Sequence, residues 1–220
     1  MAIRFVRVEQ MFGLRGGLFD GEDADVWTAV GRAIDAEVPE APDLDFKRVW
    51  WDKATEMAKD CAALANGLGG VIIVGVDDDH RDVAAAWSPV PLTRGLDLTL
   101  QQAVAANTAP KVPGILVRAV PDPADPARGV VIVGVPRSPV APHAHPVNRE
   151  RLGYPIRRST STDWLLEYEI ADRYRSRFDL AHSQQDRADD VRRAALPALD
   201  RASWVWTTVA LVPSATGSLP

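Results

Sequence analysis

The 220-residue sequence is short of cysteine, of long apolar runs and of positive charge. Cys61 is the only cysteine, which excludes a disulfide framework and a zinc site made of cysteines, and favours a reducing cytoplasm. The N-terminus lacks the apolar run of a signal peptide, and no segment approaches the roughly 20 apolar residues of a membrane span. We therefore expect a cytoplasmic protein with no membrane partner.

The charge balance restricts the partners that the chain can have. Lys and Arg number 25 against 30 Asp and Glu, a net charge of −5. Affinity for nucleic acid without sequence preference comes largely from basic side chains that neutralise phosphates. This composition argues against a protein that coats nucleic acid non-specifically, so any contact with nucleic acid needs a local basic patch. The hydrophobic content of 46% is enough for a full core.

Helical and strand patterns occur in a mixed order along the chain, which favours an α+β fold. Apolar residues recur at helical spacing in four segments, and apolar or alternating runs indicate five strands. We expect helices over residues 23–36, 52–67, 96–106 and 165–178, and strands over 3–8, 70–76, 114–120, 129–135 and 154–159. Near the C-terminus we expect a solvated helix over 181–202, which Pro197 interrupts, and a last apolar strand over 204–213.

The glycines at 67–70 lie between a predicted helix and a predicted strand. Phosphate-binding loops have the opposite order, with the helix after the glycines, so that its N-terminal amides face the anion. We therefore interpret these glycines as structural, with Asn66 and Gly67 ending the helix in a left-handed conformation.

Four motifs occur in a fixed order: "DLDFKRVWW" (43–51), "KDCAALANGLGGVIIVGVDDD" (59–79), "APHAHP" (141–146) and "YPIRRSTSTDWLLEYEIADRY" (154–174). In this order they are similar to the Schlafen-type AlbA_2 domain family over residues 37–178. The resemblance implies an AlbA-like two-layer sandwich of a mixed sheet and helices. Residues 1–36 would form an N-terminal extension, and 179–220 a C-terminal helix and strand that either joins the sheet or begins a further domain.

The resemblance also implies a function and a candidate site. Members of this family are bacterial proteins described as DNA-binding or regulatory, and some relatives cleave RNA. At the positions where those relatives have their acidic residues, this sequence has Glu40, Asp45 and Asp77, with Asp78 as a neighbouring candidate. Metal-dependent hydrolysis needs carboxylates that converge on Mg²⁺ or Mn²⁺. Asp45 replaces the Glu of the cleaving relatives, and acids at strand ends commonly form turns instead.

Basic residues provide a second set of candidates. The segment 148–158 holds four arginines against one glutamate, and arginine binds phosphate oxygens well. The alternative is a solvated face balanced by acids elsewhere. The predicted contacts to DNA or RNA are Lys47, Arg48, Arg149, Arg151, Arg157 and Arg158.

Three further patterns have mainly structural interpretations. His143 and His145 are spaced to point the same way, yet a zinc site usually needs three or four protein ligands, and the cysteines of zinc-bearing relatives are missing. The tryptophans, Trp164 among them, are interpreted as core and edge packing. By strand alternation we expect Phe46 and Val49 to face the core.

We therefore expect a nucleic-acid-binding module of a bacterial regulatory or defence-related protein. The first alternative is a metal-dependent ribonuclease, and the second is a protein-interaction module that binds no nucleic acid. Cleaving relatives use two such lobes, so a homodimer would have to supply the second one.

Overall fold

The computed structural model describes residues 5–14, 17–148 and 150–195. They belong to two compact units, one ending at Leu166 and one beginning at Glu167. The helices are α1 (Val6–Met11), α2 (Asp23–Asp35), α3 (Ala54–Asn66), α4 (Leu96–Ala106) and α5 (Glu167–Ala195). The strands are β1 (Leu44–Lys47), β2 (Gly69–Val74), β3 (Val76–Asp77), β4 (Ala86–Trp87), β5 (Val90–Pro91), β6 (Leu116–Pro121), β7 (Arg128–Pro136), β8 (His145–Pro146), β9 (Leu152–Gly153), β10 (Pro155–Arg158) and β11 (Ser161–Trp164).

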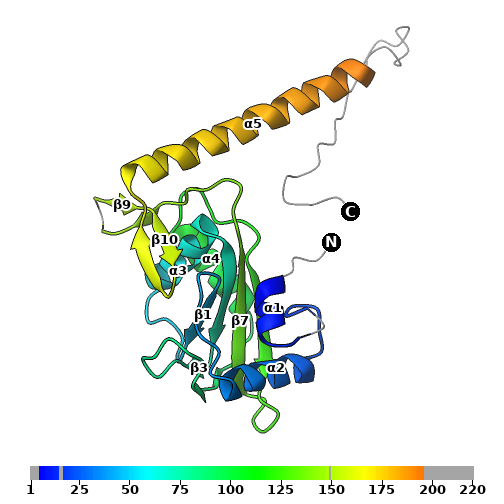
Figure 1. Ribbon diagram of the computed structural model, residues 1–220, viewed down its shortest axis with the longest axis vertical. Helices are drawn as coiled ribbons and strands as arrows, with labels where there is room; N and C mark the ends of the chain where they lie inside the picture. The colour runs from blue at the N-terminus through cyan, green and yellow to red at the C-terminus, as the bar shows by residue number, and fades with distance from the viewer. Residues whose placement is uncertain (1–4, 15–16, 149, 196–220) are drawn as a thin grey trace. The chain divides into compact units, whose positions relative to one another are not determined.

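A five-stranded mixed sheet forms the centre of the first unit (Figure 1). β1 runs parallel to β2, and β2 is antiparallel to the long strand β7. β5 and β6 pair with opposite edges of β7, because Gly129 is the partner of both Val90 and Pro121. Three two-stranded pairs, β3–β4, β8–β9 and β10–β11, complete the strands of the described residues. The α+β class with a mixed sheet is confirmed.

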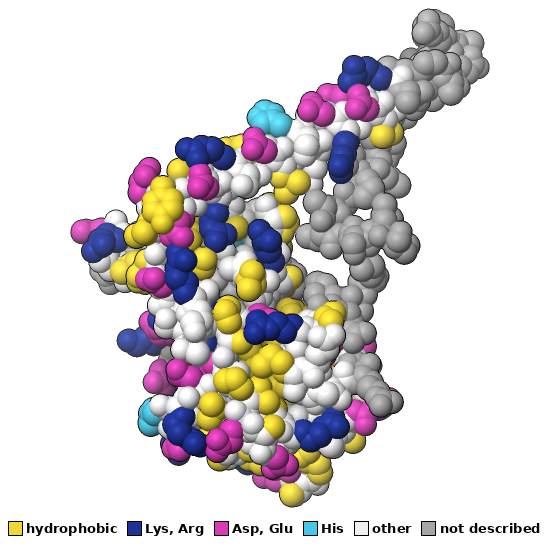
Figure 2. Space-filling model, viewed as in Figure 1, with side chains coloured by type: hydrophobic (Ala, Val, Ile, Leu, Met, Phe, Trp, Pro, Cys, Tyr) yellow, Lys and Arg dark blue, Asp and Glu magenta, His cyan; other side chains and the backbone are white. Residues whose placement is uncertain are grey.

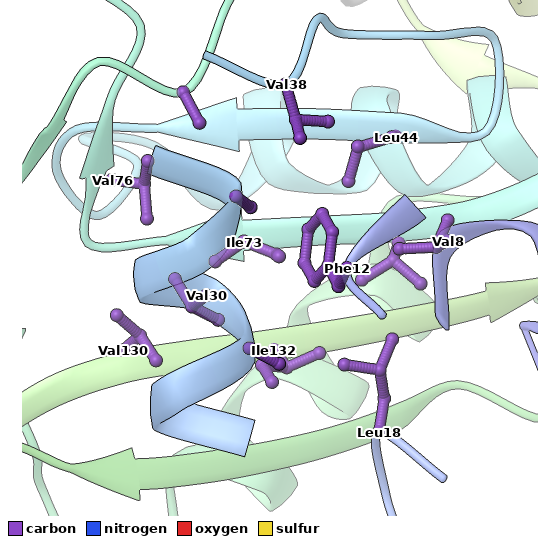
Figure 3. Packing of buried hydrophobic residues seen from close by; sticks show 14 of the residues in the cluster. Val8, Phe12, Leu18, Val30, Val38, Leu44, Ile73, Val76, Val130 and Ile132 are labelled. Atoms are coloured by element: carbon purple, nitrogen blue, oxygen red, sulfur yellow. The ribbon is translucent and has the colours of Figure 1, made fainter. Parts of the chain in front are cut away.

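Strand alternation gives the sheet two apolar faces, and helices cover both. On one face Ile73 and Ile132 pack against residues of α1 and α2, as the close-up of this core shows (Figure 3). On the other face Ile72 and Val74 pack against α3 and α4. The N-terminal segment, expected as an extension of a two-layer sandwich, therefore adds a helical layer to the sheet.

Several local expectations differ from the structure. Residues 6–11 form α1 where a strand was expected, because Val8 and Phe12, one helical turn apart, bury their side chains in the core. The expectation that Val49 faces the core is wrong: Val49 is exposed, because it lies beyond the end of β1 at Lys47 and is an odd number of residues from the buried Phe46. α5 is one continuous helix over 167–195, and the strand predicted over 204–213 lies outside the described residues.

The turn between α3 and β2 shows why glycines are needed there. A Cβ on Gly70 would lie 2.4 Å from the carbonyl oxygen of Asp43, and Gly69 has a φ of +76°. Gly67, in contrast, has a φ of −98°, so the expected left-handed end of the helix is wrong at this residue. The glycines are structural, as interpreted, and Gly70 allows the chain leading into β1 to approach β2.

Candidate functional site

Arg157, on β10, is the centre of a buried polar network. Its side chain is only 6% exposed, and its two terminal nitrogens lie 2.7 Å from Oε2 of Glu40 and 2.9 Å from Oδ1 of Asp45. The guanidinium also donates hydrogen bonds to the carbonyl oxygens of Ala41 and Leu44. Arg157 thus binds two carboxylates and two carbonyls of one short segment, residues 40–45.

A tight turn brings the two acids together. Ala41 and Leu44 exchange backbone hydrogen bonds of 3.0 and 3.1 Å, so the chain reverses between Glu40 and Asp45. The backbone N–H of Phe46 then donates to Oε1 of Glu40 at 2.9 Å. Asp45 lies on β1 with its side chain on the face opposite Leu44 and Phe46, which belong to the core beneath α2.

The network continues toward solvent through Lys47. Nζ of Lys47 lies 2.9 Å from Oδ2 of Asp45, with which it forms an ion pair. The same nitrogen lies 3.7 Å from Oδ2 of Asp60 on α3. The indole N–H of Trp51 donates to the same oxygen of Asp60 at 2.8 Å. Asp60 and Trp51 were not among the predicted site residues, although an acid within the apolar helix 52–67 was a usable signal.

The charges of this network do not cancel when every group is ionised, because three carboxylates face one arginine and one lysine. Burial, together with the negative charge of Asp45, raises the pKa of Glu40 to about 7. Burial also raises the pKa of Asp60, against the opposing effect of Lys47. Burial tends to lower the pKa of Lys47, but Asp45 and Asp60 outweigh it and raise that pKa. The network is therefore suited to hold one proton near neutral pH.

Asp77 does not join Glu40 and Asp45. In the parallel register Asp45 is the partner of Ile72, whereas Asp77 lies on β3, after β2 has ended at Val74. Its carboxylate lies 3.5 Å from Nε of Arg48 and accepts the N–H of Asp79.

Asp78 likewise accepts a backbone N–H, that of His80, so both acids form turns, as the structural interpretation expected. Across 5–14, 17–148 and 150–195 no three His, Cys, Asp or Glu residues are grouped to hold a metal ion. The donors predicted for Mg²⁺ or Mn²⁺, namely Glu40, Asp45, Asp77 and Asp78, therefore do not fit such an ion. They are separated, and Arg157 already binds the two that meet.

The basic residues predicted to contact phosphates also separate. Arg157 is buried, contrary to its expected place in a surface patch, because it neutralises the acidic turn. Lys47 is partly exposed and lies beside Asp45 and Asp60. Arg48 is largely exposed, with Asp77 beside it.

Two arginines of the predicted patch lie at the surface near β10. Arg151 is exposed, and Arg158 is 45% exposed with Nε 3.6 Å from the carboxylate of Asp163. Arg149 lies outside the described residues. Among the described residues, Arg151 and Arg158 are thus the exposed arginines of the segment 148–158. Arg48 is exposed as well, but it lies at the end of β1.

Asn66, the last residue of α3, connects the histidine segment to the domain. Its amide donates to the carbonyl oxygens of His143 and Pro155 at 2.9 and 2.8 Å, and its Oδ1 accepts the N–H of His143 at 2.7 Å. Nδ1 of His143 lies 2.7 Å from the carbonyl oxygen of Pro110. His143 and His145 are both buried, so this segment is part of the core and not an exposed metal site.

A mixed sheet between helices, with an arginine on a small hairpin tied to an acidic turn, defines a small α+β domain. The sequence model of the family described as Schlafen, AlbA_2 matches residues 40–165, more than half of the chain. The chain belongs to the Schlafen AlbA_2 family. Membership of this family suggests a nucleic-acid-binding module. Within the described ranges, every helix is too short or too polar to span a membrane.

A structural comparison finds similarity to the DIP2311 protein from Corynebacterium diphtheriae, known from a crystal structure. The sequence identity is 15% and the TM-score is 0.41. The similarity covers 70% of this chain but only 29% of the DIP2311 chain. No curated protein matches the sequence.

Proposed function

We propose that this chain is a nucleic-acid-binding module that contacts the phosphates of DNA or RNA through Arg151 and Arg158. The observation that carries the proposal is the exposure of these two arginines within a domain of the Schlafen AlbA_2 family. Guanidinium groups bind phosphate oxygens in a bidentate manner and remain charged at any physiological pH. A regulatory or defence role for this binding stays a prediction.

The buried network supports the proposal by fixing the strand that carries Arg158. Arg157 and Arg158 are neighbours on β10, so strand alternation points their side chains in opposite directions. Because Arg157 is held by Glu40 and Asp45, Arg158 is presented outward on a rigid element. Arg157, one of the six predicted phosphate contacts, would thus act by positioning its neighbour.

The expected binding is modest and depends on salt. Glu150 and Asp163 offset part of the positive charge near the two arginines, and the face in Figure 2 carries basic side chains interspersed with acidic ones. No broad basic field is therefore available on that face, and the contact would be local. Cleavage is not part of the proposal, because the carboxylates that it would need are separated.

The test measures fluorescence anisotropy of labelled oligonucleotides, single-stranded and duplex, between about 50 and about 200 mM salt. Reversing both charges, Arg151→Glu with Arg158→Glu, should weaken binding at least about tenfold and reduce the salt slope by about 1 to 2. The matched control reverses Arg32 and Arg81, two exposed arginines at other positions, with the same change in net charge. Equal weakening by both pairs would refute a local contact. A native chain without salt-dependent binding would favour the protein-interaction alternative.

A further inference from the structure

Trp164, the last residue of β11, is unusually exposed for a tryptophan that was expected to pack. Its exposed fraction is 40%, although a buried indole contributes more to stability. The six-membered ring contacts Gly153 of β9 so closely that a Cβ there would lie 2.5 Å from Cζ3 and 2.7 Å from Cε3. The missing side chain at Gly153 therefore leaves room for one edge of the indole, while the rest of the ring stays in solvent.

The same side of the β8–β9 hairpin carries an exposed valine and an exposed arginine. Cγ2 of Val147 would lie 2.9 Å from a Cβ on Gly153, so it borders the indole. The backbone N–H of Val147 donates to the carbonyl oxygen of Arg151 at 2.9 Å, which continues the hairpin register past Pro146 and Leu152.

Side chains two residues apart on a strand, and those of cross-strand partners, share one face. Arg151 therefore lies on the face of Gly153 and Val147, at a strand distance of about 7 Å from Gly153. Leu152 belongs to the opposite face. We call the surface formed by Val147, Arg151, Gly153 and Trp164 the tryptophan face.

We propose that the tryptophan face binds single-stranded nucleic acid, with Trp164 stacking on an unpaired base and Arg151 binding a neighbouring phosphate. The inference rests on the proposed function and names the form of nucleic acid that this surface takes. Every base has an aromatic face, so stacking on tryptophan does not depend on sequence. In a duplex that face is covered by the neighbouring base pairs, so a stacking side chain selects unpaired strands.

The chemistry of the surface favours a nucleic acid over a protein partner. An indole held against a glycine, with Arg151 two residues along the same face of the hairpin, matches both parts of a nucleotide: the base and the phosphate. The apolar part of the surface is small, since only Trp164 and Val147 contribute to it. Stable protein interfaces bury about 800 Å² on each partner, far more than these two side chains offer.

The test compares Trp164→Ala, Trp164→Phe and Leu152→Ala in binding to one labelled sequence, as a single strand of RNA or DNA and as a duplex. We expect Trp164→Ala to weaken single-strand binding about 5- to 150-fold and Trp164→Phe to retain most of it. Leu152 is the matched control, because it is 63% exposed on the same hairpin but on the opposite face. Its replacement should leave the affinity unchanged.

Circular dichroism and thermal unfolding show whether each variant is folded, and Trp164→Phe keeps the test open if the alanine variant is not. The inference is overturned if Trp164→Ala and Leu152→Ala have equal effects, or if the native chain binds duplex as tightly as single strands. In these cases the proposed function survives, provided that the charge reversals at Arg151 and Arg158 still weaken binding. If the native chain binds neither form, the proposed function itself fails.

Discussion

Replacing Arg157 by methionine should destabilise the domain far more than replacing its neighbour Arg158. Methionine keeps much of the side-chain volume but removes the positive charge that faces Glu40 and Asp45. It also removes the donors to the carbonyl oxygens of Ala41 and Leu44. Two carboxylates would then remain buried without their main partner, a costly arrangement at neutral pH.

The magnitude follows from the burial of all three groups. The side chains of Arg157, Glu40 and Asp45 are 6%, 4% and 3% exposed, so water cannot replace the lost partner without local opening. Removing one partner of a buried ion pair costs about 3–5 kcal/mol, a large share of the roughly 5–15 kcal/mol by which domains are stable. Arg158 lies 3.6 Å from Asp163 with both side chains exposed, and such a pair contributes about 0–1 kcal/mol.

Urea unfolding, followed by tryptophan fluorescence, measures the difference. With a slope near 2 kcal/mol per molar, Arg157→Met should lower the midpoint by about 2 M, and Arg158→Met by less than about 0.5 M. The loss caused by Arg157→Met should grow as the pH rises from about 5 to about 8, because protonated carboxyls tolerate burial better than ionised ones. Equal midpoints for the two variants would refute the argument that Arg157 stabilises a buried acidic turn.

Two further predictions concern the same part of the fold. The folded pKa of Glu40, about 7, lies above its ordinary value of 4.5, so its protonated form stabilises the fold below pH 4.5 and this contribution is lost as the pH rises through 7. The native chain should therefore lose on the order of 3 kcal/mol of stability between pH 5 and 8, and the Glu40→Gln variant should lack this loss. Parallel pH profiles of the two proteins in urea unfolding would contradict the argument. Asn66→Ala should cost about 3 kcal/mol in thermal unfolding, because it leaves three buried backbone groups without their partner. Asn107→Ala removes the side-chain hydrogen bond to the carbonyl oxygen of Ala103 and should cost about 1 kcal/mol.

The elements that the sequence predicted best are those with a long, regular apolar pattern. Residues 96–106 are predicted and observed as a helix, and the apolar run 129–135 lies within β7. The N-terminal residues were the hardest, because 6–11 offer too few positions to distinguish a helix from a strand. Only their burial against the sheet determines that they form α1.

The site could be predicted in its residue types but not in its pairings. The sequence suggested that Glu40 and Asp45 meet, and the turn between Ala41 and Leu44 brings them together. It did not indicate that Arg157 lies between them. Arg157 follows Asp45 by 112 residues in the sequence, and its position depends on how the β10–β11 hairpin packs. Asp77 was separated from them by the strand register, which composition and spacing do not define.

Whether an acidic pair is catalytic or structural depends on what already occupies its oxygens. Here Oε1 of Glu40 accepts the N–H of Phe46, and Oε2 of Glu40 accepts a hydrogen bond from Arg157. Oδ1 of Asp45 forms an ion pair with Arg157 at 2.9 Å. Oδ2 of Asp45 faces Lys47 at 2.9 Å. A divalent cation at this pair would have to displace both basic side chains from a buried position, at the cost of leaving those charges without partners. The acids are therefore best understood as the support of β10, and the proposed contact with nucleic acid would come from residues such as Arg158 that this support holds at the surface.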